Sequence, residues 1–443
     1  MKKLFLAIAA AGSLALGVGL GSIERAQAVT LSAVGERAFE DVTTCMTSGR
    51  DKALDVYYLI DQSGSLDWTD PSMAREGIIR NSVSELGRFV DEGISVAVAA
   101  SGFAAGVIEF QDWTTLDSRE DAAELGAQLS ERVVSQFGGG GYRSNTDWQA
   151  GLSAAKEKLT DRPDSCRMLI WFTDGGINPT GFVEDSTRSL GDLCQPGITP
   201  DSIPSGTGQF GLMQDFRRAG IPVFGVLLTN EAASLDRFQQ AYPGDWDERL
   251  AQEKWLASFM RPLVEGRGGI QNTSTLAPFA EGELTCAELD AEGFAPPGQA
   301  NGAFIDAADP VVLAYQFLRI GGQISGGAGS AIEDGRFSIP QGTAGFELIV
   351  SSDRWALTGP ASSEVAASSA EPGLAQVDTS GGASRIQIDV RDSDELIGEW
   401  SFDSAAEYSD LFLFSGLTLE LDRDRVSTIL SDFDNTLTGQ VTR

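Results

Sequence analysis

A short apolar run that ends in a polar loop constrains the fold of this chain more than any other feature. Residues 54–60 carry β-branched and aromatic side chains on both faces, and Asp61, Ser63 and Ser65 follow at alternate positions. A strand that is apolar on both faces is typical of the centre of a parallel sheet that helices cover on each side. Ligands of such sheets bind at the carboxyl ends of the strands, where this loop must lie.

Two later stretches supply further oxygen atoms of the same kind. Residues 167–172 form a second apolar run, which leads to Asp174 and two glycines. A glycine-rich stretch, residues 138–145, delivers Thr146 to the start of an expected helix. Carboxylates and hydroxyls are hard oxygen donors, which suit Mg²⁺, Mn²⁺ or Ca²⁺. The sequence therefore predicts a site for one divalent cation.

The order of these residues resembles the metal-ion-dependent adhesion site (MIDAS) of the von Willebrand factor type A (VWA) family. That motif is Asp-x-Ser-x-Ser, a distant Thr and then a distant Asp, and it is matched by Asp61, Ser63, Ser65, Thr146 and Asp174. The resemblance covers roughly residues 50–321. It implies that the two aspartates fix the ion, while the three hydroxyls are neutral ligands or orient the others. Mg²⁺ is the ion that we expect first, with Mn²⁺ and Ca²⁺ as alternatives.

The rest of this region alternates between strand and helix patterns. We expect helices from Asp70-Pro71 to Gly93 and over residues 121–137, 147–159, 250–265 and 309–318, and strands over residues 94–100, 107–110, 221–229 and 302–307. This alternation predicts an α/β fold with a doubly wound, mostly parallel sheet, in which residues 94–110 form a hairpin at one edge. Asp147 is interpreted as an acidic residue stabilised at the amino end of a helix, not as a ligand.

The expected domains follow from changes in composition. Residues 29–321 form the VWA-like domain, with insertions at 175–208 and 266–301 that we expect to influence specificity. Residues 322–335 have the composition of a linker, and residues 336–443 alternate in the manner of a smaller antiparallel β domain, most simply a sandwich. Because the chain stops soon after a strand-like segment, we expect this last module to be incomplete or shared with a partner.

The amino terminus and the charge indicate where the protein acts. Residues 1–28 are typical of a signal peptide that is cleaved after Ala28, with an uncleaved anchor as the alternative. No further run of membrane-spanning length follows, so we expect a secreted protein, extracellular or at the cell surface. The chain has 64 acidic and 32 basic residues, which disfavours nucleic acid as a partner. Histidine is absent, which excludes Ser-His-Asp catalysis and histidine-bound zinc.

The four cysteines are Cys45, Cys166, Cys194 and Cys286. An even number in an exported chain favours two disulfides, and the sequence alone allows three pairings. The VWA resemblance narrows the choice, because the strands that follow Cys45 and Cys166 are parallel neighbours in that family. It implies a Cys45–Cys166 bridge and leaves Cys194 to pair with Cys286.

Three functions are compatible with these residues. The first is a binding module, not an enzyme, whose cation captures an Asp or Glu carboxylate of a partner protein in adhesion or assembly. The alternatives are a metal-dependent hydrolase and a metal site that only stabilises an extracellular scaffold. Asp432 and Asp434 imitate the nucleophile motif of haloacid-dehalogenase-like phosphatases, but only a few residues follow them. That family needs more than a hundred residues after its motif, so we interpret the match as coincidence.

Overall fold

The structure is a computed structural model that describes most of the two expected domains. The described residues are 31–48, 53–66, 70, 73–91, 93–135, 145–177, 193, 211–228, 258–269, 283–287, 289–307, 315, 318–319, 322, 327–360, 364–366, 375–380, 382–390, 394–404, 406, 409–415, 418–420 and 440–442. The predicted signal peptide, the glycine-rich stretch, most of the 175–208 insertion and the Asp432 motif lie outside them. None of the described helices is long and apolar enough to cross a membrane.

A six-stranded sheet forms the centre of the first domain. Its strands lie in the order β3-β2-β1-β4-β5-β8. Only β3 is antiparallel to its neighbour, and the other pairs are parallel. The strands are β1 (Ala53–Asp61), β2 (Ser95–Phe103), β3 (Val107–Leu116), β4 (Cys166–Thr173), β5 (Val223–Leu228) and β8 (Ala303–Ala307).

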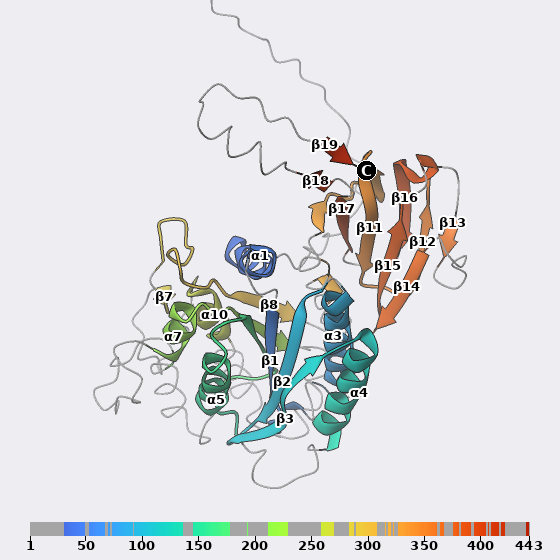
Figure 1. Cartoon of the computed structure of the whole chain (residues 1–443). Helices are drawn as coiled ribbons and strands as arrows, with labels where there is room; N and C mark the ends of the chain where they lie inside the picture. The colour runs from blue at the N-terminus through green and yellow to red at the C-terminus, as the bar shows by residue number, and fades with distance from the viewer. Residues whose placement is uncertain are drawn as a thin grey trace, which may run out of the picture.

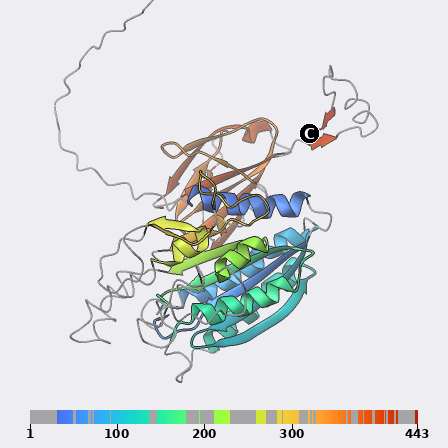
Figure 2. The same cartoon turned by 90° about the vertical axis from the view of Figure 1, so that its left-hand side faces the viewer.

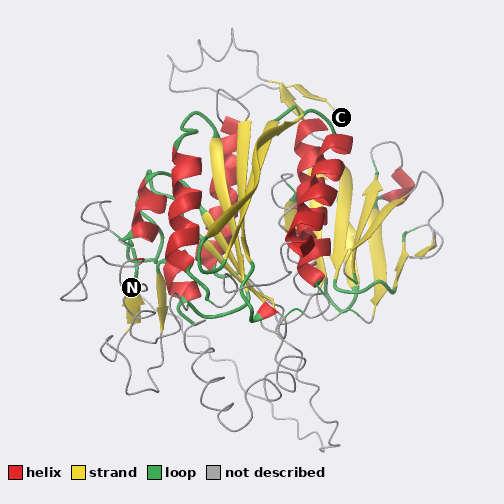
Figure 3. Cartoon of the chain, turned by 90° about the horizontal axis from the view of Figure 1, so that it is seen from below, coloured by secondary structure: helices red, strands yellow, loops and turns green. Residues whose placement is uncertain are grey.

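Helices cover both faces of this sheet, which confirms the predicted α/β class. Figure 3 shows helices on either side of the sheet. The helices α1 (Ala33–Ser48), α3 (Ala74–Asp91) and α4 (Arg119–Ser135) pack on one face. The other face is covered by α5 (Trp148–Thr160), α7 (Leu212–Arg218) and α10 (Met260–Glu265), beside a small pair of strands, β6 (Arg267–Gly269) and β7 (Glu283–Thr285).

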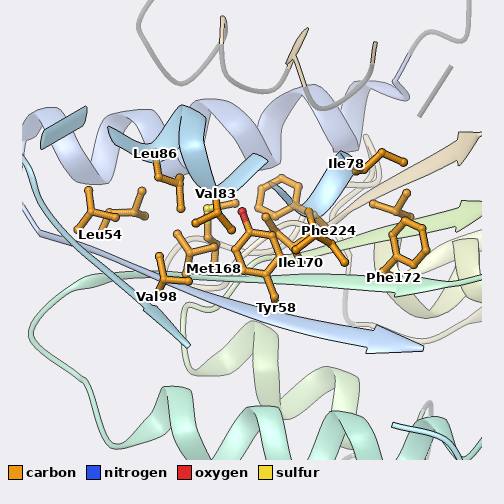
Figure 4. Close-up of a cluster of buried hydrophobic side chains, with 14 of the residues drawn as sticks. Leu54, Tyr58, Ile78, Val83, Leu86, Val98, Met168, Ile170, Phe172 and Phe224 are labelled. Carbon is orange, nitrogen blue, oxygen red and sulfur yellow. The ribbon is translucent and has the colours of Figure 1, made fainter. Parts of the chain in front are cut away.

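The two apolar layers explain why β1 lacks a polar face. Tyr58 points into the layer beneath α3, together with Val83 and Leu86 (Figure 4). Its neighbour Tyr57 faces the opposite layer, with Leu152 of α5. Since successive side chains of a strand point to opposite faces, a strand that is covered on both sides is apolar over most of its length. The exception within β1 is Asp55, which pairs with Arg162 at 2.6 Å.

Several details differ from the sequence interpretation. Helices α1 and α7 were not expected, and α3 begins at Ala74 instead of at Asp70-Pro71. The reason for the later start is that Asp70 accepts a hydrogen bond from the backbone of Arg75, five residues on, at 3.3 Å. The described part of the predicted 250–265 helix is α10.

The predicted disulfide between α1 and β4 is confirmed. Cys45 and Cys166 are bonded, with their Cα atoms 5.9 Å apart. The reason is the one expected: Leu54 of β1 pairs with Cys166, so the leading ends of these strands are adjacent. Cys286 is buried and disulfide-bonded. Cys194 lies outside the described residues, so the second pairing stays a prediction.

The second domain is built from two antiparallel sheets. One has the order β14-β15-β11-β17-β9 and the other β10-β16-β12-β13. Apolar side chains of both sheets share one core, in which Trp400, Phe337 and Phe346 are in ring contact. The strands are β9 (Ala328–Ser330), β10 (Arg336–Ile339), β11 (Thr343–Val350), β12 (Trp355–Thr358), β13 (Glu364–Ala366), β14 (Ala375–Ser380), β15 (Ala383–Asp389), β16 (Gly398–Ser404) and β17 (Ser409–Ser415), followed by the separate pair β18 (Thr418–Glu420) and β19 (Gln440–Thr442).

The two domains pack against each other. Figures 1 and 2 show the β domain beside α3 and α1. Ile349, Ala383 and Phe412 of the β domain belong to the same apolar cluster as the α1, α3 and α4 face. The stretch interpreted as a linker, residues 322–335, contains β9, which pairs with β17. Its small residues, typical of linkers, also suit an edge strand because they leave the backbone accessible.

Candidate metal centre

The centre of the candidate site is Asp61, the last residue of β1. It is fully buried, and its Oδ1 accepts a hydrogen bond from the backbone N–H of Ser63 at 2.7 Å. The backbone N–H of Gln62 donates to the carbonyl of Phe103, at the end of the neighbouring strand β2, at 2.8 Å. These bonds hold the first turn after β1 against the sheet, so that the hydroxyls of Ser63 and Ser65 follow in a defined direction.

The neighbouring strand β4 delivers Asp174 to the same place. Ser65 Oγ donates to Asp174 Oδ1 at 3.1 Å, across a sequence separation of 109 residues. Ser65 Oγ also lies 2.9 Å from Ser63 Oγ. Asp61, Ser63, Ser65 and Asp174 therefore form one continuous hydrogen-bonded group, at the edge of the sheet where the paired strands β1 and β4 end.

Thr146 approaches this edge of the sheet from the start of α5. Its side chain is buried, and the backbone N–H of the next residue, Asp147, donates to the carbonyl of Ala104 at 2.8 Å. Ala104 directly follows β2, whose last residue pairs with Asp61. Asp147 is the N-cap of α5, because its Oδ1 accepts from the backbone N–H of Ala150 at 3.0 Å. The interpretation of Asp147 as a residue of the helix end is confirmed.

Thr173 was not expected at the site. Its hydroxyl donates to Oδ2 of Asp61, so that both carboxyl oxygens of Asp61 accept bonds from the protein. Burial raises the pKa of Asp61, and the hydrogen bonds from Thr173 and Ser63 oppose that rise. A sequence signal did exist, since Thr173 is the polar last residue of a strand that is otherwise apolar over residues 168–172.

A buried ion pair joins the loop that follows β1 to helix α3. Arg75 and Asp70 are both almost inaccessible, and Arg75 Nε lies 3.5 Å from Asp70 Oδ2. The charge of Arg75 also acts to lower the pKa of Asp61. The pair fixes the end of the loop to the first turn of α3. Its position in the fold could not be deduced from spacing alone, because the pair depends on how the chain runs between β1 and α3.

The donor set fits a small divalent cation. Ser63 Oγ, Ser65 Oγ and Asp174 Oδ1 follow one another at 2.9 and 3.1 Å. Neighbouring oxygens in an octahedral Mg²⁺ shell, with bonds of about 2.0–2.1 Å, are roughly 3 Å apart. The distances between these hydrogen-bonded oxygens thus match the distance between neighbouring ligands of Mg²⁺. The three oxygens would therefore need to move little to bind the ion. In the described part of the chain there is no group of three or more Asp, Glu or Cys side chains that could hold a metal.

The chain resembles several solved structures at low sequence identity and low structural similarity. No model of a known protein family matches the chain, and no curated protein matches it. Similar solved structures include a pilus adhesin, SpaC from Lactobacillus rhamnosus GG, at 12% identity over 82% of this chain and 39% of that one, with a TM-score of 0.34. The PilB minor pilin from Streptococcus sanguinis is 14% identical over 61% of each chain, with a TM-score of 0.33.

A third similar structure is a von Willebrand factor type A protein from Catenulispora acidiphila. It is 11% identical over 82% of this chain and 58% of its own length, with a TM-score of 0.30. This chain therefore spans less than two thirds of each of these three proteins. The structural neighbours thus include a VWA protein and pilus proteins, while the proposals below depend on the residues of this chain.

Proposed function

We propose that this chain is an exported protein-binding module that holds one divalent cation, Mg²⁺ first, and captures an acidic side chain of a partner. The proposed ligands are Asp61, Ser63, Ser65, Thr146 and Asp174. The observation that carries the proposal is the row of three oxygens from Ser63, Ser65 and Asp174, spaced at 2.9 and 3.1 Å. It brings together residues that follow β1 and β4 and are far apart in the sequence.

The residues of the site have distinct roles in this proposal. Asp61 is held from two sides, by the backbone of Ser63 and by the hydroxyl of Thr173, so its carboxylate cannot rotate freely. Ser65 is less buried than Asp61 and lies at the outer side of the group. The hydroxyl of Ser65 can direct its lone pairs to an ion and its proton to Asp174, and the hydroxyl of Ser63 lies beside it at 2.9 Å.

Charge favours a carboxylate as the partner's group. Asp61 and Asp174 together balance a divalent cation, and the other three ligands are neutral. A bound cation of this kind supplies a coordination position that an Asp or Glu of the partner can fill. The two aspartates do not exceed the charge of the cation, so the site could accept the additional negative charge of such a side chain.

Binding is preferred to catalysis because of the groups around the site. The sequence has no histidine to serve as a general base. Both carboxylates are assigned to the ion, and the oxygens of Asp61 already accept hydrogen bonds. Export is proposed from the signal-like residues 1–28, which lie outside the described part of the structure.

The test is calorimetric titration of the chelator-treated chain with Mg²⁺, Mn²⁺ and Ca²⁺, beside the Asp174→Ala variant. We expect saturable binding at one site, which Asp174→Ala removes while its circular dichroism stays unchanged. Absence of binding by the folded wild-type chain would overturn the proposal. Turnover of phosphate esters by the metal-loaded chain would support the hydrolase alternative instead.

Partner capture is tested separately, with immobilised peptides that carry one Glu, one Gln or no polar side chain at the central position. We expect the metal-loaded chain to bind the Glu peptide in preference to the Gln peptide, and chelation to abolish this preference. Metal binding without any preference for Glu would leave the site as a stabiliser of the fold.

A further inference from the structure

A second concave surface lies between the two domains, away from the candidate metal centre. It is a groove of about 660 Å³, with α1 on one side and strands β9 and β17 on the other. The α1 side contributes Glu36, Glu40 and Thr43, and the β-domain side contributes Gly329, Ser330 and Asp410. None of these residues belongs to the candidate metal centre, which lies at the carboxyl end of β1.

The strand that borders the groove is an edge strand. β9 is the last strand of its sheet, and β17 is its only neighbour among the described strands. In an antiparallel ladder each strand presents alternate N–H and C=O groups on its outer side. Residues 327–330 are Gly, Ala, Gly and Ser, so none of them carries a large side chain. A Cβ atom placed on Gly329 would meet nothing within 4 Å.

No side chain of this edge strand blocks a further strand, although β9 is only three residues long. Proteins commonly protect edge strands with Pro, with Lys or with inward-pointing charges. β9 carries none of these residues. Its first two residues, Ala328 and Gly329, are exposed. Leu411 and Phe412 of β17 also line the groove, and both side chains are almost fully buried in the cores of the protein.

The charge of the groove favours a basic occupant. Three carboxylates line it, from Glu36, Glu40 and Asp410, against the single guanidinium of Arg319. Arg319 is largely buried and is engaged by Glu36 at 2.7 Å and by Asp410 at 2.8 Å. The Glu40 side chain is 65% exposed on the groove wall and pairs with Arg37 at 3.2 Å. With Arg37 included, the three carboxylates still exceed the cations, so the groove keeps an excess of negative charge near an open backbone edge.

We infer that this groove binds an extended, basic segment of a partner protein, which adds to β9 as a further strand. Backbone hydrogen bonds to β9 would supply most of the affinity, and lysine or arginine side chains facing α1 would supply selectivity. The segment would contact both domains at once. This surface is independent of the metal-centred function proposed above.

The probe is a fluorescein-labelled ten-residue peptide of alternating Lys and Val, titrated with the purified full-length chain in the presence of chelator. We expect saturable binding by fluorescence anisotropy. There are two control peptides. The first has alternating Glu and Val, and the second is the Lys-Val peptide in which the backbone nitrogens along one edge of the strand are methylated. Since methylation blocks strand pairing and keeps the charge, it should weaken binding at least tenfold.

The matched protein variants are Glu40→Lys and Glu399→Lys. Both change the net charge equally, but Glu399 lies on β16, outside the groove. We expect Glu40→Lys to weaken binding of the Lys-Val peptide at least fivefold and Glu399→Lys to leave it within twofold. Both side chains are exposed, so neither change should prevent folding.

Hydrogen exchange identifies the occupant. The backbone amides of residues 328–330 should exchange slowly only when the Lys-Val peptide is bound. No saturable binding, equal effects of the two charge reversals, or undiminished binding of the methylated peptide would overturn the inference. Slow exchange of these amides without peptide would overturn it as well. Slow exchange at every protein concentration would indicate that a segment of this chain covers β9. Exchange that slows as the protein concentration rises would indicate a second copy of the chain.

Discussion

Thr173 Oγ1 donates a hydrogen bond to Oδ2 of Asp61, so the last residue of β4 orients the last residue of β1. The two strands are parallel neighbours, and Ile60 pairs with Phe172 just before this contact. Because Asp61 is fully buried, an oxygen without a donor would be costly there. Thr173 thus holds the proposed ligand Asp61 in place without being one of the five predicted ligands.

Thr173→Val tests this relationship, because valine keeps the shape and removes the hydroxyl. Loss of a group that orients a metal ligand typically weakens metal affinity by about 10–100-fold, and we expect that loss for Mg²⁺. We also expect the free energy of unfolding to fall by about 1–3 kcal/mol. Calorimetry and urea unfolding measure the two effects.

The matched control for Thr173→Val is Ser101→Ala. Ser101 Oγ is also a buried hydroxyl, 2.6 Å from the hydroxyl of Tyr57, but it lies within β2 and not at the loop. This control should lower stability and leave Mg²⁺ affinity unchanged. Wild-type affinity in Thr173→Val would show that the hydrogen bond to Asp61 does not support the site.

Thr146 and Asp147 are neighbours with separable roles. Thr146→Ala should remove a proposed ligand and weaken Mg²⁺ binding while the melting temperature of the metal-free chain stays near that of the wild type. Asp147→Ala should remove the N-cap of α5 and cost about 1 kcal/mol of stability, with Mg²⁺ affinity nearly unchanged. If Asp147→Ala abolished metal binding and Thr146→Ala did not, the assignment of the two residues would be reversed.

The sequence predicted the central part of the fold because its signal there is strong. A strand that is apolar on both faces has few alternatives to the centre of a parallel sheet, and β1 and β4 are of this kind. The order of the five predicted ligands then placed Asp61 and Asp174 at one edge, where the structure joins them through Ser63 and Ser65. The metal itself remains a prediction.

Other features could not be predicted because they depend on contacts that are distant in the sequence. Helix α1 is held by its disulfide to β4 and by apolar contacts of Phe39, including its ring contact with Phe224. The ion pair of Arg75 with Asp70 requires the actual course of the loop. Strand β9 has the composition of a linker and is a strand only because β17 lies beside it.

A buried charged network joins the β domain to α3. Arg385 pairs with Glu85 of α3, and its Nε lies 3.6 Å from Oε1 of Glu347, which is fully buried. Arg385→Met would leave Glu347 without its cation, so we expect a loss of about 3–5 kcal/mol in urea unfolding.

The double variant Arg385→Met/Glu347→Gln tests the cause of that loss. Neutralising Glu347 removes the uncompensated buried charge, and the hydrogen bond from Gln387 can be retained by the amide oxygen. We therefore expect the double variant to be more stable than Arg385→Met alone. Purely additive losses would show that packing, not charge, dominates at this position.

Glu265 gives a prediction for the dependence of stability on pH. Burial raises its pKa above the ordinary value of 4.5, although Ser32 Oγ donates to it at 2.8 Å. The folded chain therefore binds this proton more tightly than the unfolded chain. Stability should fall as the pH rises from about 4.5 through the raised pKa, and this part of the loss should be absent in Glu265→Gln.

The measurement is the melting temperature of Glu265→Gln and of the wild-type chain between pH 4 and pH 8, in chelator. The difference, variant minus wild type, should increase with pH over that window and then remain constant. A difference that does not change with pH would contradict the assigned cause.

The Cys45–Cys166 bridge closes a ring of the chain that spans 121 residues. The ring contains β1, β2, β3, α3, α4 and α5, and hence four of the five predicted ligands. A protease that cuts once inside this ring releases no fragment, because both pieces remain covalently joined. A nicked molecule should therefore run as one band without reductant and as two bands with it. In a proteolytic environment, a cut between two of these four residues would therefore leave both pieces of the candidate metal centre in the same molecule.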